Sequence, residues 1–297
     1  MNQKTKGVMC ILCSAFCFSM MNVFVRLSGD IPSIQKSFFR NLVAALFALF
    51  ILLRNNESFR WKPGNLKYLL LRSTAGTIGI LGNFYAVDHL VMADATMLNK
   101  MSPFFGVIFS SLFLKEKCKP TQALAILGAF IGSLFIIKPS FANADLFASL
   151  IGFMGGVAAG AAYTTVRFLG LRGERGPLIV FFFSTFSCLV VSPVLIFDYH
   201  PMTTSQLILL LIAGLCAAGG QFSVTAAYKF APARELSVYD YSQILFAAVT
   251  GFFVFNQIPD IYSFLGYAII CSMAILMFIY NNRQFKLEQA RLAEQKQ

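Results

Sequence analysis

Long apolar segments separated by short polar connections recur along the whole chain of 297 residues. A helix that crosses a membrane needs about 20 mostly apolar residues, because the hydrocarbon core of a bilayer is about 30 Å thick. No connection is long enough to hold a soluble domain, so the pattern predicts an all-α polytopic membrane protein. The ten expected transmembrane helices are Gly7–Leu27, Ile34–Leu53, Leu66–Leu90, Ala93–Leu114, Thr121–Ile137, Leu146–Leu169, Pro177–Phe197, Ser205–Phe230, Ala233–Phe255 and Ile261–Tyr280.

The sequence also resembles itself when it is shifted by 141 positions. The matching residues under this shift include Val25 with Val166, Gly79 with Gly220, and Asn99 with Asp240. Each copy has five expected helices, and a unit that crosses the membrane an odd number of times is followed by a copy of opposite orientation. We therefore expect two inverted repeats, 1–140 and 141–280, and a basic cytoplasmic tail, 281–297. Many secondary transporters have this layout and bind their substrate near the repeat interface.

Composition and charge agree with a membrane protein. Hydrophobic residues make up 57% of the chain, charged residues 12%, and the mean hydropathy is +0.69, which excludes a soluble globular protein. The net charge of +11 comes mainly from Lys and Arg in connections on one side of the membrane. By the positive-inside rule that side is cytoplasmic and holds both termini. We expect a multi-pass protein of the plasma membrane, the inner membrane of a bacterium, with no nucleic-acid partner.

The sequence offers no metal or cofactor site. Cys10, Cys13 and Cys17 share one face of the first expected helix, but the two histidines, His89 and His200, fall at the opposite membrane surface. Six of the seven cysteines lie within expected helices, where a thiol acts as a small packing group. We therefore expect no metal, no disulfide and no cofactor.

Two segments carry a family resemblance. Leu90–Ile137 contains an Ala-Asp-Ala-Thr sequence, an internal Ser-Pro, a Leu-Lys-Glu-Lys end and a Gly-rich helix, and Lys229–Asp260 has a related pattern. Both resemble the EamA-type transporters of the drug/metabolite transporter superfamily. The resemblance implies ten helices around a central cavity lined mainly by helices 1, 3, 4, 6, 8 and 9, with helices 5 and 10 at the periphery. Gln257 stands where many members have the acid that corresponds to Glu116, so any role for that acid is limited to the first repeat.

Polar residues within the expected helices are candidates for binding, since a central charge costs about 2.5–3.5 kcal/mol on insertion scales. Those of the first repeat lie mainly in the outer halves of their helices, and those of the second repeat in the inner halves, so both sets approach the midplane. The candidate substrate-binding residues are Asn22, Asn83, Asn99, Lys100, Tyr163, Gln221, Tyr239, Asp240, Tyr241 and Gln243.

Each charged candidate has two interpretations. Lys100 either pairs with a substrate carboxylate, or reaches the membrane surface or an acid at Asp94 or Asp88. Asp240 either binds a substrate ammonium or carries a coupling proton, because burial favours the neutral acid. Its alternative is a structural ion pair with Lys229 or Arg234, near the same membrane face.

The uncharged candidates also have more than one interpretation. Tyr239 and Tyr241 point about 100° to either side of Asp240 on a helix, so we expect only one of them beside it. An aromatic face there suits a cationic or zwitterionic solute. The Asn and Gln residues bind substrate or form helix–helix hydrogen bonds, worth about 0.6 kcal/mol on average. For Arg40, next to Asn41, we favour structural anchoring or a place at the outer gate.

Glycine spacing and one proline predict local packing. Gly152, Gly156 and Gly160 allow close approach of another backbone. Gly128 and Gly132 do the same for the fifth helix, which we expect to pack on the tenth helix or on a second subunit, although nothing else supports a homo-oligomer. Pro103 is expected to kink the fourth helix just after Asn99 and Lys100 by removing a hydrogen bond.

The sequence thus favours a secondary transporter that moves a small organic metabolite by alternating access. The expected solute is an amino acid or a charged amino-acid or nucleoside derivative, and a proton is a possible coupling ion. No phosphate-binding loop is present, so we expect no direct use of ATP. The alternatives are a non-transporting membrane subunit or receptor and, less favoured, a membrane-embedded enzyme.

Overall fold

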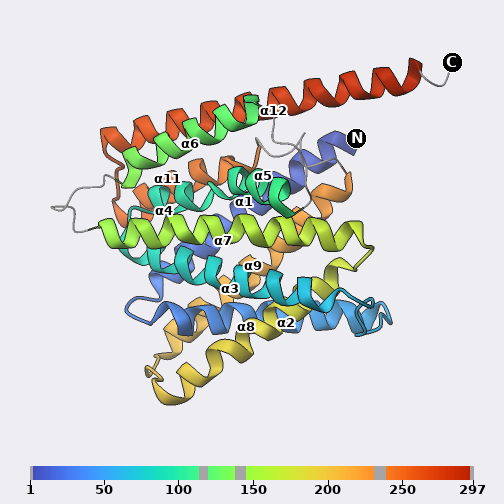
Figure 1. Ribbon diagram of the computed structural model, residues 1–297. Helices are drawn as coiled ribbons and strands as arrows, with labels where there is room; N and C mark the ends of the chain where they lie inside the picture. Colours follow the sequence, from blue (N-terminus) through green and yellow to red (C-terminus); the bar gives the residue numbers. More distant parts are fainter. Residues whose placement is uncertain (1–2, 114–119, 138–144, 231–238, 295–297) are drawn as a thin grey trace.

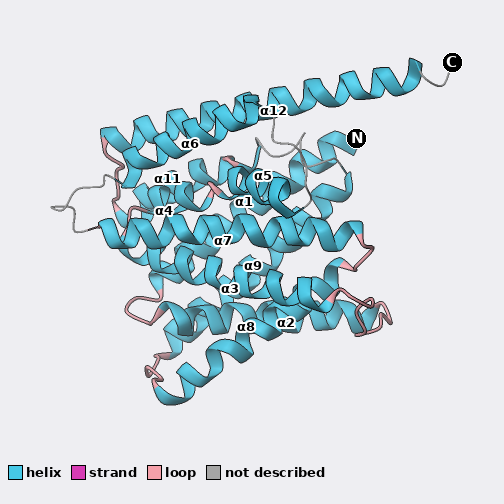
Figure 2. Cartoon of the chain, in the orientation of Figure 1, coloured by secondary structure: helices cyan, strands magenta, loops and turns pink. Residues whose placement is uncertain are grey.

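A computed structural model describes residues 3–113, 120–137, 145–230 and 239–294 of the chain. In these ranges the regular structure is helical throughout, with no strand (Figure 2). The helices are α1 (Gln3–Leu27), α2 (Ser33–Arg54), α3 (Leu66–His89), α4 (Met92–Asn99), α5 (Ser102–Phe113), α6 (Pro120–Ile137), α7 (Leu146–Leu171), α8 (Gly176–Phe197), α9 (Thr204–Phe230), α11 (Ser242–Phe255) and α12 (Ile261–Glu294).

The prediction of an all-α polytopic membrane protein is confirmed. Among the described residues, seven helices are long and apolar enough to cross a bilayer: Thr5–Leu27, Ser33–Arg54, Pro120–Ile137, Leu146–Leu171, Gly176–Phe197, Thr204–Val224 and Ile261–Gln284. The other expected spans are α3, which carries charged side chains, the fourth span, which is divided in two, and the ninth span. Residues 231–238, which include the expected start of the ninth span at Ala233, lie outside the described ranges, as does Glu116.

The fourth expected span is broken at the place where a kink was predicted. Helix α4 ends at Asn99, Lys100 and Met101 form a turn, and α5 begins at Ser102. Pro103 has no N–H to donate to the Asn99 carbonyl. The Phe104 N–H bonds the Met101 carbonyl at 3.0 Å, three residues back, so this N–H does not occupy the Lys100 carbonyl. The helix is therefore broken and not only bent, and the Lys100 carbonyl receives no hydrogen bond from the Phe104 N–H.

The ninth span has a break as well. Tyr239 and Asp240 are helical, Tyr241 forms a turn, and α11 continues from Ser242. The Ile244 N–H bonds the Tyr241 carbonyl at 3.0 Å. Tyr241 lies 141 positions after Lys100, so the two breaks match under the shift that relates the two halves of the sequence.

The helices pack in antiparallel pairs. Helix α1 lies against α9, α3 against α7, α2 against α8 and α6 against α12. Figure 1 shows α6 and α12 along one edge of the bundle and α2 and α8 along the other. A Cβ on Gly128 or Gly132 of α6 would come within 2.8 Å of Met273 or Ile270 of α12, so the glycines allow this close packing. The expected packing of the fifth span on the tenth is confirmed.

The connections gather at two ends of the bundle. One end, called the basic end below, carries the N-terminal part of α1 and the connections 55–65 and 172–175. The other, called the distal end, carries the connections 28–32, 198–203 and 256–260 (Figure 1). Helix α12 runs without interruption to Glu294, so the start of the predicted tail continues the last span as a helix.

At the basic end, Glu174 ties two connections together. Its carboxylate accepts hydrogen bonds from the Lys62 N–H at 3.0 Å and from the Asn65 amide at 2.9 Å, and Asn65 in turn accepts one from Arg172 Nε at 2.7 Å. Burial alone would raise the pKa of Glu174. The hydrogen bonds and the nearby charge of Arg175 outweigh burial and lower the pKa below its usual value of 4.5.

This lowered pKa predicts an acid-sensitive contact. A carboxyl group whose pKa is lower in the folded state stabilises the fold above its unfolded pKa and loses that effect as the pH falls through the folded value. We expect the wild-type melting temperature in detergent to fall between pH 5 and pH 3, and Glu174→Gln to remove part of this fall. Asp198→Asn, at an exposed position of the distal end, serves as the control. A wild-type pH profile in Glu174→Gln contradicts the assignment.

Candidate substrate site between the two broken helices

The breaks in the fourth and ninth spans face each other. Lys100 donates from Nζ to Asp240 Oδ2 at 2.5 Å, and the side chains are 8% and 23% exposed. The Tyr241 hydroxyl donates to the Lys100 carbonyl at 3.1 Å, the carbonyl that receives no hydrogen bond from the Phe104 N–H. An ion pair and a hydrogen bond to the main chain thus join residues that are about half the sequence apart.

Asp94 and Asp88, the acids considered as alternative partners of Lys100, do not pair with it in the structure. Asp94 accepts a hydrogen bond from the Tyr267 hydroxyl at 2.5 Å, and Asp88 pairs with Lys36 at 2.7 Å, so neither acid neutralises Lys100. The side chain of Lys229 and the residue Arg234 lie outside the described part of the chain. Local sequence spacing suggested these partners, whereas the observed pair depends on the packing of α11 against α4.

The tyrosines have different surroundings. Tyr241 is buried in the largest apolar cluster, together with Met97, Leu98 and Ile244, whereas Tyr239 is partly exposed. Tyr163 of α7 is 54% exposed, yet its hydroxyl is close enough to Asp240 and to buried arginines to be affected by their charges. Tyr163 is thus an accessible side chain on which the charges of the bundle interior act.

The amide candidates are spread over the bundle. Asn83 donates to Asn22 across α3 and α1 at 3.3 Å, which is the helix–helix hydrogen bond considered as the alternative to substrate binding. Asn99 is half-buried beside the break, and Gln243 is buried at the start of α11. Gln221 lines a separate pocket. Of the ten candidates, Lys100, Asp240 and Tyr241 are brought together directly, and Tyr163 lies nearby.

The pocket that contains Gln221 lies between α2, α8 and α9. Arg40 lies on its wall and donates to the Asn41 side chain at 2.5 Å, and Asn41 in turn donates to Ser187 of α8 at 2.8 Å. The anchoring expected near Arg40 is therefore provided by Asn41, which links α2 to α8. The lining residues are Arg40, Ala44, Val180, Phe183, Ser184, Ala218, Gln221 and Phe222.

Sequence reasoning missed Arg72. Arg72 lies six residues into α3 and is buried, with its guanidinium 3.9 Å from the centre of the Phe183 ring. Its signal in the sequence is a charge inside an apolar helix, the criterion that was applied to Lys100. Within the described ranges, no group of three or more His, Cys, Asp or Glu side chains is placed to hold a metal ion.

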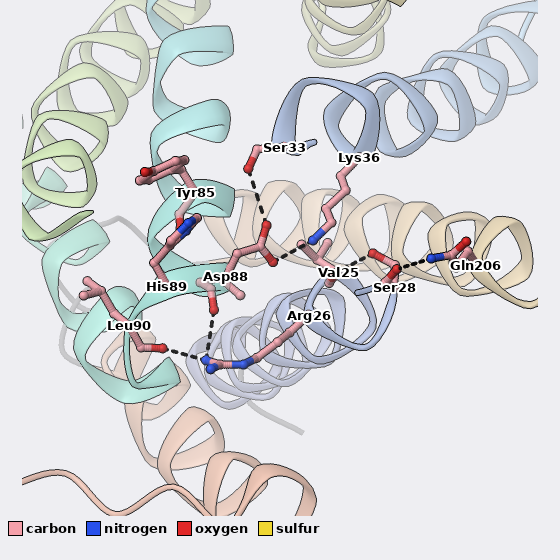
Figure 3. Close-up of polar contacts among 11 residues, drawn as sticks. Val25, Arg26, Ser28, Ser33, Lys36, Tyr85, Asp88, His89, Leu90 and Gln206 are labelled. Carbon is pink, nitrogen blue, oxygen red and sulfur yellow. Dashed lines mark hydrogen bonds and ion pairs between the residues drawn. The ribbon is translucent and has the colours of Figure 1, made fainter. Parts of the chain in front are cut away.

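The distal end is held by polar contacts (Figure 3). Asp88 at the end of α3 accepts from Lys36 at 2.7 Å and from Ser33 at 3.4 Å, both on α2. Arg26 of α1 donates to the carbonyl groups of Val87 and Leu90 at 3.0 and 2.6 Å. These contacts join α1, α2 and α3 where the chain leaves the bundle.

Comparisons with known proteins place the chain in a family. The EamA-like transporter family matches residues 5–138. The pseudopaline exporter of Pseudomonas aeruginosa is 31% identical over 274 residues, which cover 91% of this chain and 95% of the exporter. The chain belongs to the EamA-like transporter family. The resemblance seen in the sequence is thereby confirmed, and this EamA-like protein is a membrane transporter.

The EamA-like protein also matches a human protein and a solved structure. Solute carrier family 35 member G1 of Homo sapiens is 27% identical over 267 residues, which cover 85% of this chain and 73% of that protein. A solved crystal structure aligns with a TM-score of 0.64 at 14% identity, over 92% of this chain and 98% of that chain. At this identity the structural match shows the fold alone.

Proposed function

We propose that the protein is a secondary transporter that moves a small charged metabolite across the bacterial inner membrane by alternating access. The solute is an amino acid or a charged amino-acid or nucleoside derivative. The observation that carries the proposal is the ion pair between Lys100 and Asp240, which joins the two broken helices in the bundle interior. Broken helices and interior charges are typical of substrate sites in transporters.

The helix pairing supports an inverted repeat of 1–140 and 141–280. Under the shift of 141 positions, α1 corresponds to α7 and α3 to α9, so the pair α1–α9 maps onto the pair α7–α3. The pairs α2–α8 and α6–α12 map onto themselves. Helix pairs map onto one another in this way when two similar units are related by a two-fold axis. In this arrangement the basic end is cytoplasmic.

The ion pair has a role in the transport cycle. In the empty site each charge neutralises the other, which lowers the cost of keeping both away from water. A zwitterionic solute replaces both partners at once, with its ammonium on Asp240 and its anionic group on Lys100. A proton on Asp240 would release Lys100 in a similar way, which makes a proton the favoured coupling ion.

We infer that the site is reached from the basic end. Lys36, Asp88 and Arg26 hold the distal end together, while Tyr163 lies about 12 Å from the end of α7 at the basic end and is exposed. We infer that the site opens to the cytoplasm in this conformation and that the distal contacts break in the opposite one.

Cysteine labelling and counterflow together test the proposal. In a background without Cys13 and Cys118 (Cys13→Ser/Cys118→Ser), we expect Tyr163→Cys to react with a membrane-impermeant maleimide from the cytoplasmic side and the buried neighbour Ala162→Cys to stay unlabelled. Proteoliposomes preloaded with single amino acids, nucleosides or their charged derivatives should show saturable counterflow of at least one labelled solute, with and without a pH gradient. If Tyr163→Cys is labelled from neither side and no solute shows counterflow, the proposal is wrong, and a receptor or subunit role takes its place.

A further inference from the structure

Two arginines are buried in the bundle without an acidic partner in the described part of the chain. Arg40 of α2 and Arg72 of α3 are each 5% exposed. The Nε–H of neither residue has a hydrogen-bond acceptor among the described residues. Arg40 gives one N–H to Asn41, and Arg72 stacks on Phe183, which leaves most of the five N–H donors of each guanidinium without a protein partner.

Phe183 relates the two arginines, because Arg72 stacks on its ring and the same side chain lines a pocket together with Arg40. The positive charges of Arg40 and Arg72 repel each other, and the ionisable groups whose charges act on them include Tyr163 and Cys188. The acid on the other side of Tyr163, Asp240, is already paired with Lys100. Two like charges in a dry interior repel each other and are costly unless an anion neutralises them. Within the described part of the chain, no carboxylate supplies that charge.

A pocket lies beside Arg40, between α2, α8 and α9. Arg40 lines it, and so does Phe183, on whose ring Arg72 stacks. Ser184 lines it as well, and its buried hydroxyl has no hydrogen-bond partner among the described residues. A planar guanidinium with free N–H groups matches the two oxygens of a carboxylate or phosphate, and a neighbouring hydroxyl adds a third donor. The donors of this pocket therefore suit an oxyanion.

We propose that Arg40 and Arg72 form a subsite that binds the carboxylate or phosphate group of an anionic ligand, in the pocket between α2, α8 and α9. The subsite deepens the proposed function, on which it rests for its role, because the bound group belongs to the transported solute. The solute then extends from this subsite towards Tyr163 and the ion pair of Lys100 with Asp240. Its chemical class is a small metabolite with at least one oxyanion.

Anion-dependent stabilisation of the purified protein tests the subsite without transport. The melting temperature in detergent is measured against increasing sodium succinate or sodium phosphate at an ionic strength held constant with sodium chloride, and uncharged succinamide serves as the neutral probe. We expect a saturable rise with succinate, phosphate or both, and none with succinamide. The two anion series decide between a carboxylate and a phosphate. No rise above the chloride baseline with either anion overturns the proposal.

Matched variants locate the effect. Arg40→Gln and Arg72→Gln should weaken the apparent anion affinity at least tenfold, whereas Arg54→Gln, at the exposed end of α2, should leave it unchanged. Because each Gln variant removes a buried charge without a partner, the melting temperature without anion should stay the same or rise. Lower stability without anion together with an unchanged anion response means that the arginines are structural, and overturns the proposal.

Lysine variants and the counterflow assay test the remaining outcomes. If a Gln variant does not fold, Arg40→Lys or Arg72→Lys keeps the charge but not the paired N–H geometry, and an unchanged affinity in that variant overturns the subsite. Anion stabilisation without counterflow of any solute contradicts the proposed transport and supports the subsite. Counterflow that both Gln variants retain, without anion stabilisation, contradicts the subsite and supports transport.

Discussion

Asp240→Asn is expected to reduce counterflow at least tenfold while the protein still inserts and folds. The substitution keeps an oxygen that can accept a hydrogen bond from Lys100 at the observed 2.5 Å position, but it removes the negative charge. Lys100 then stays charged and nearly buried without an ionic partner, and the site loses its attraction for a substrate ammonium. Counterflow in proteoliposomes gives the rate, and size-exclusion chromatography with a melting curve reports folding.

Variants of Lys100 and Asp240 distinguish an effect on stability from an effect on transport. Breaking a buried ion pair costs about 3–5 kcal/mol when one charge stays uncompensated, so Lys100→Met should also lower the melting temperature. The double variant Lys100→Met/Asp240→Asn is neutral and should recover stability without recovering transport. Asp198→Asn, exposed at the distal end, should behave as wild type. Wild-type counterflow by Asp240→Asn from pH 5.5 to pH 8 rejects a role for Asp240 in binding an ammonium or a proton.

The apolar pattern located the helices because a bilayer imposes length and composition on every span. The proline predicted a kink after Lys100, and the structure has a break there, because the loss of one N–H is a local property of the residue. The bonding partner of Lys100 was not predictable in this way. Asp240 is about half the chain away, and its contact depends on how α11 packs against α4.

The surroundings of the Arg72 side chain were also not predictable from the local sequence. Distance along the sequence placed it near the cytoplasmic connection, but the direction of its side chain depends on which face of α3 meets α8. Phe183 provides the surface on which the guanidinium stacks, and no local pattern links the two residues. The charge inside an apolar helix was visible in the sequence, whereas the missing acidic partner became apparent only from the packed structure.

The glycines of α7 were predicted to allow close packing, and the structure identifies the surface that they meet. A Cβ on Gly156 would lie 2.4 Å from the Leu98 carbonyl oxygen and 3.5 Å from the Asn99 Cα. These atoms belong to the last turn of α4, directly before the break that presents Lys100. Because the neighbour is main chain, it cannot turn away as a flexible side chain would.

Gly156→Ala is therefore expected to lower stability and transport together. Forcing an extra methyl group into a packed contact costs about 1–3 kcal/mol, and here relief requires a shift of α4 against α7 that also moves Lys100 away from Asp240. Gly170→Ala on the same helix is the matched control, because a Cβ there meets nothing within 4 Å and alanine favours a helix by about 1 kcal/mol over glycine. Melting curves and counterflow of the two variants give the comparison. Equal stability and equal counterflow in Gly156→Ala and Gly170→Ala show that the contact between α4 and α7 does not position the ion pair.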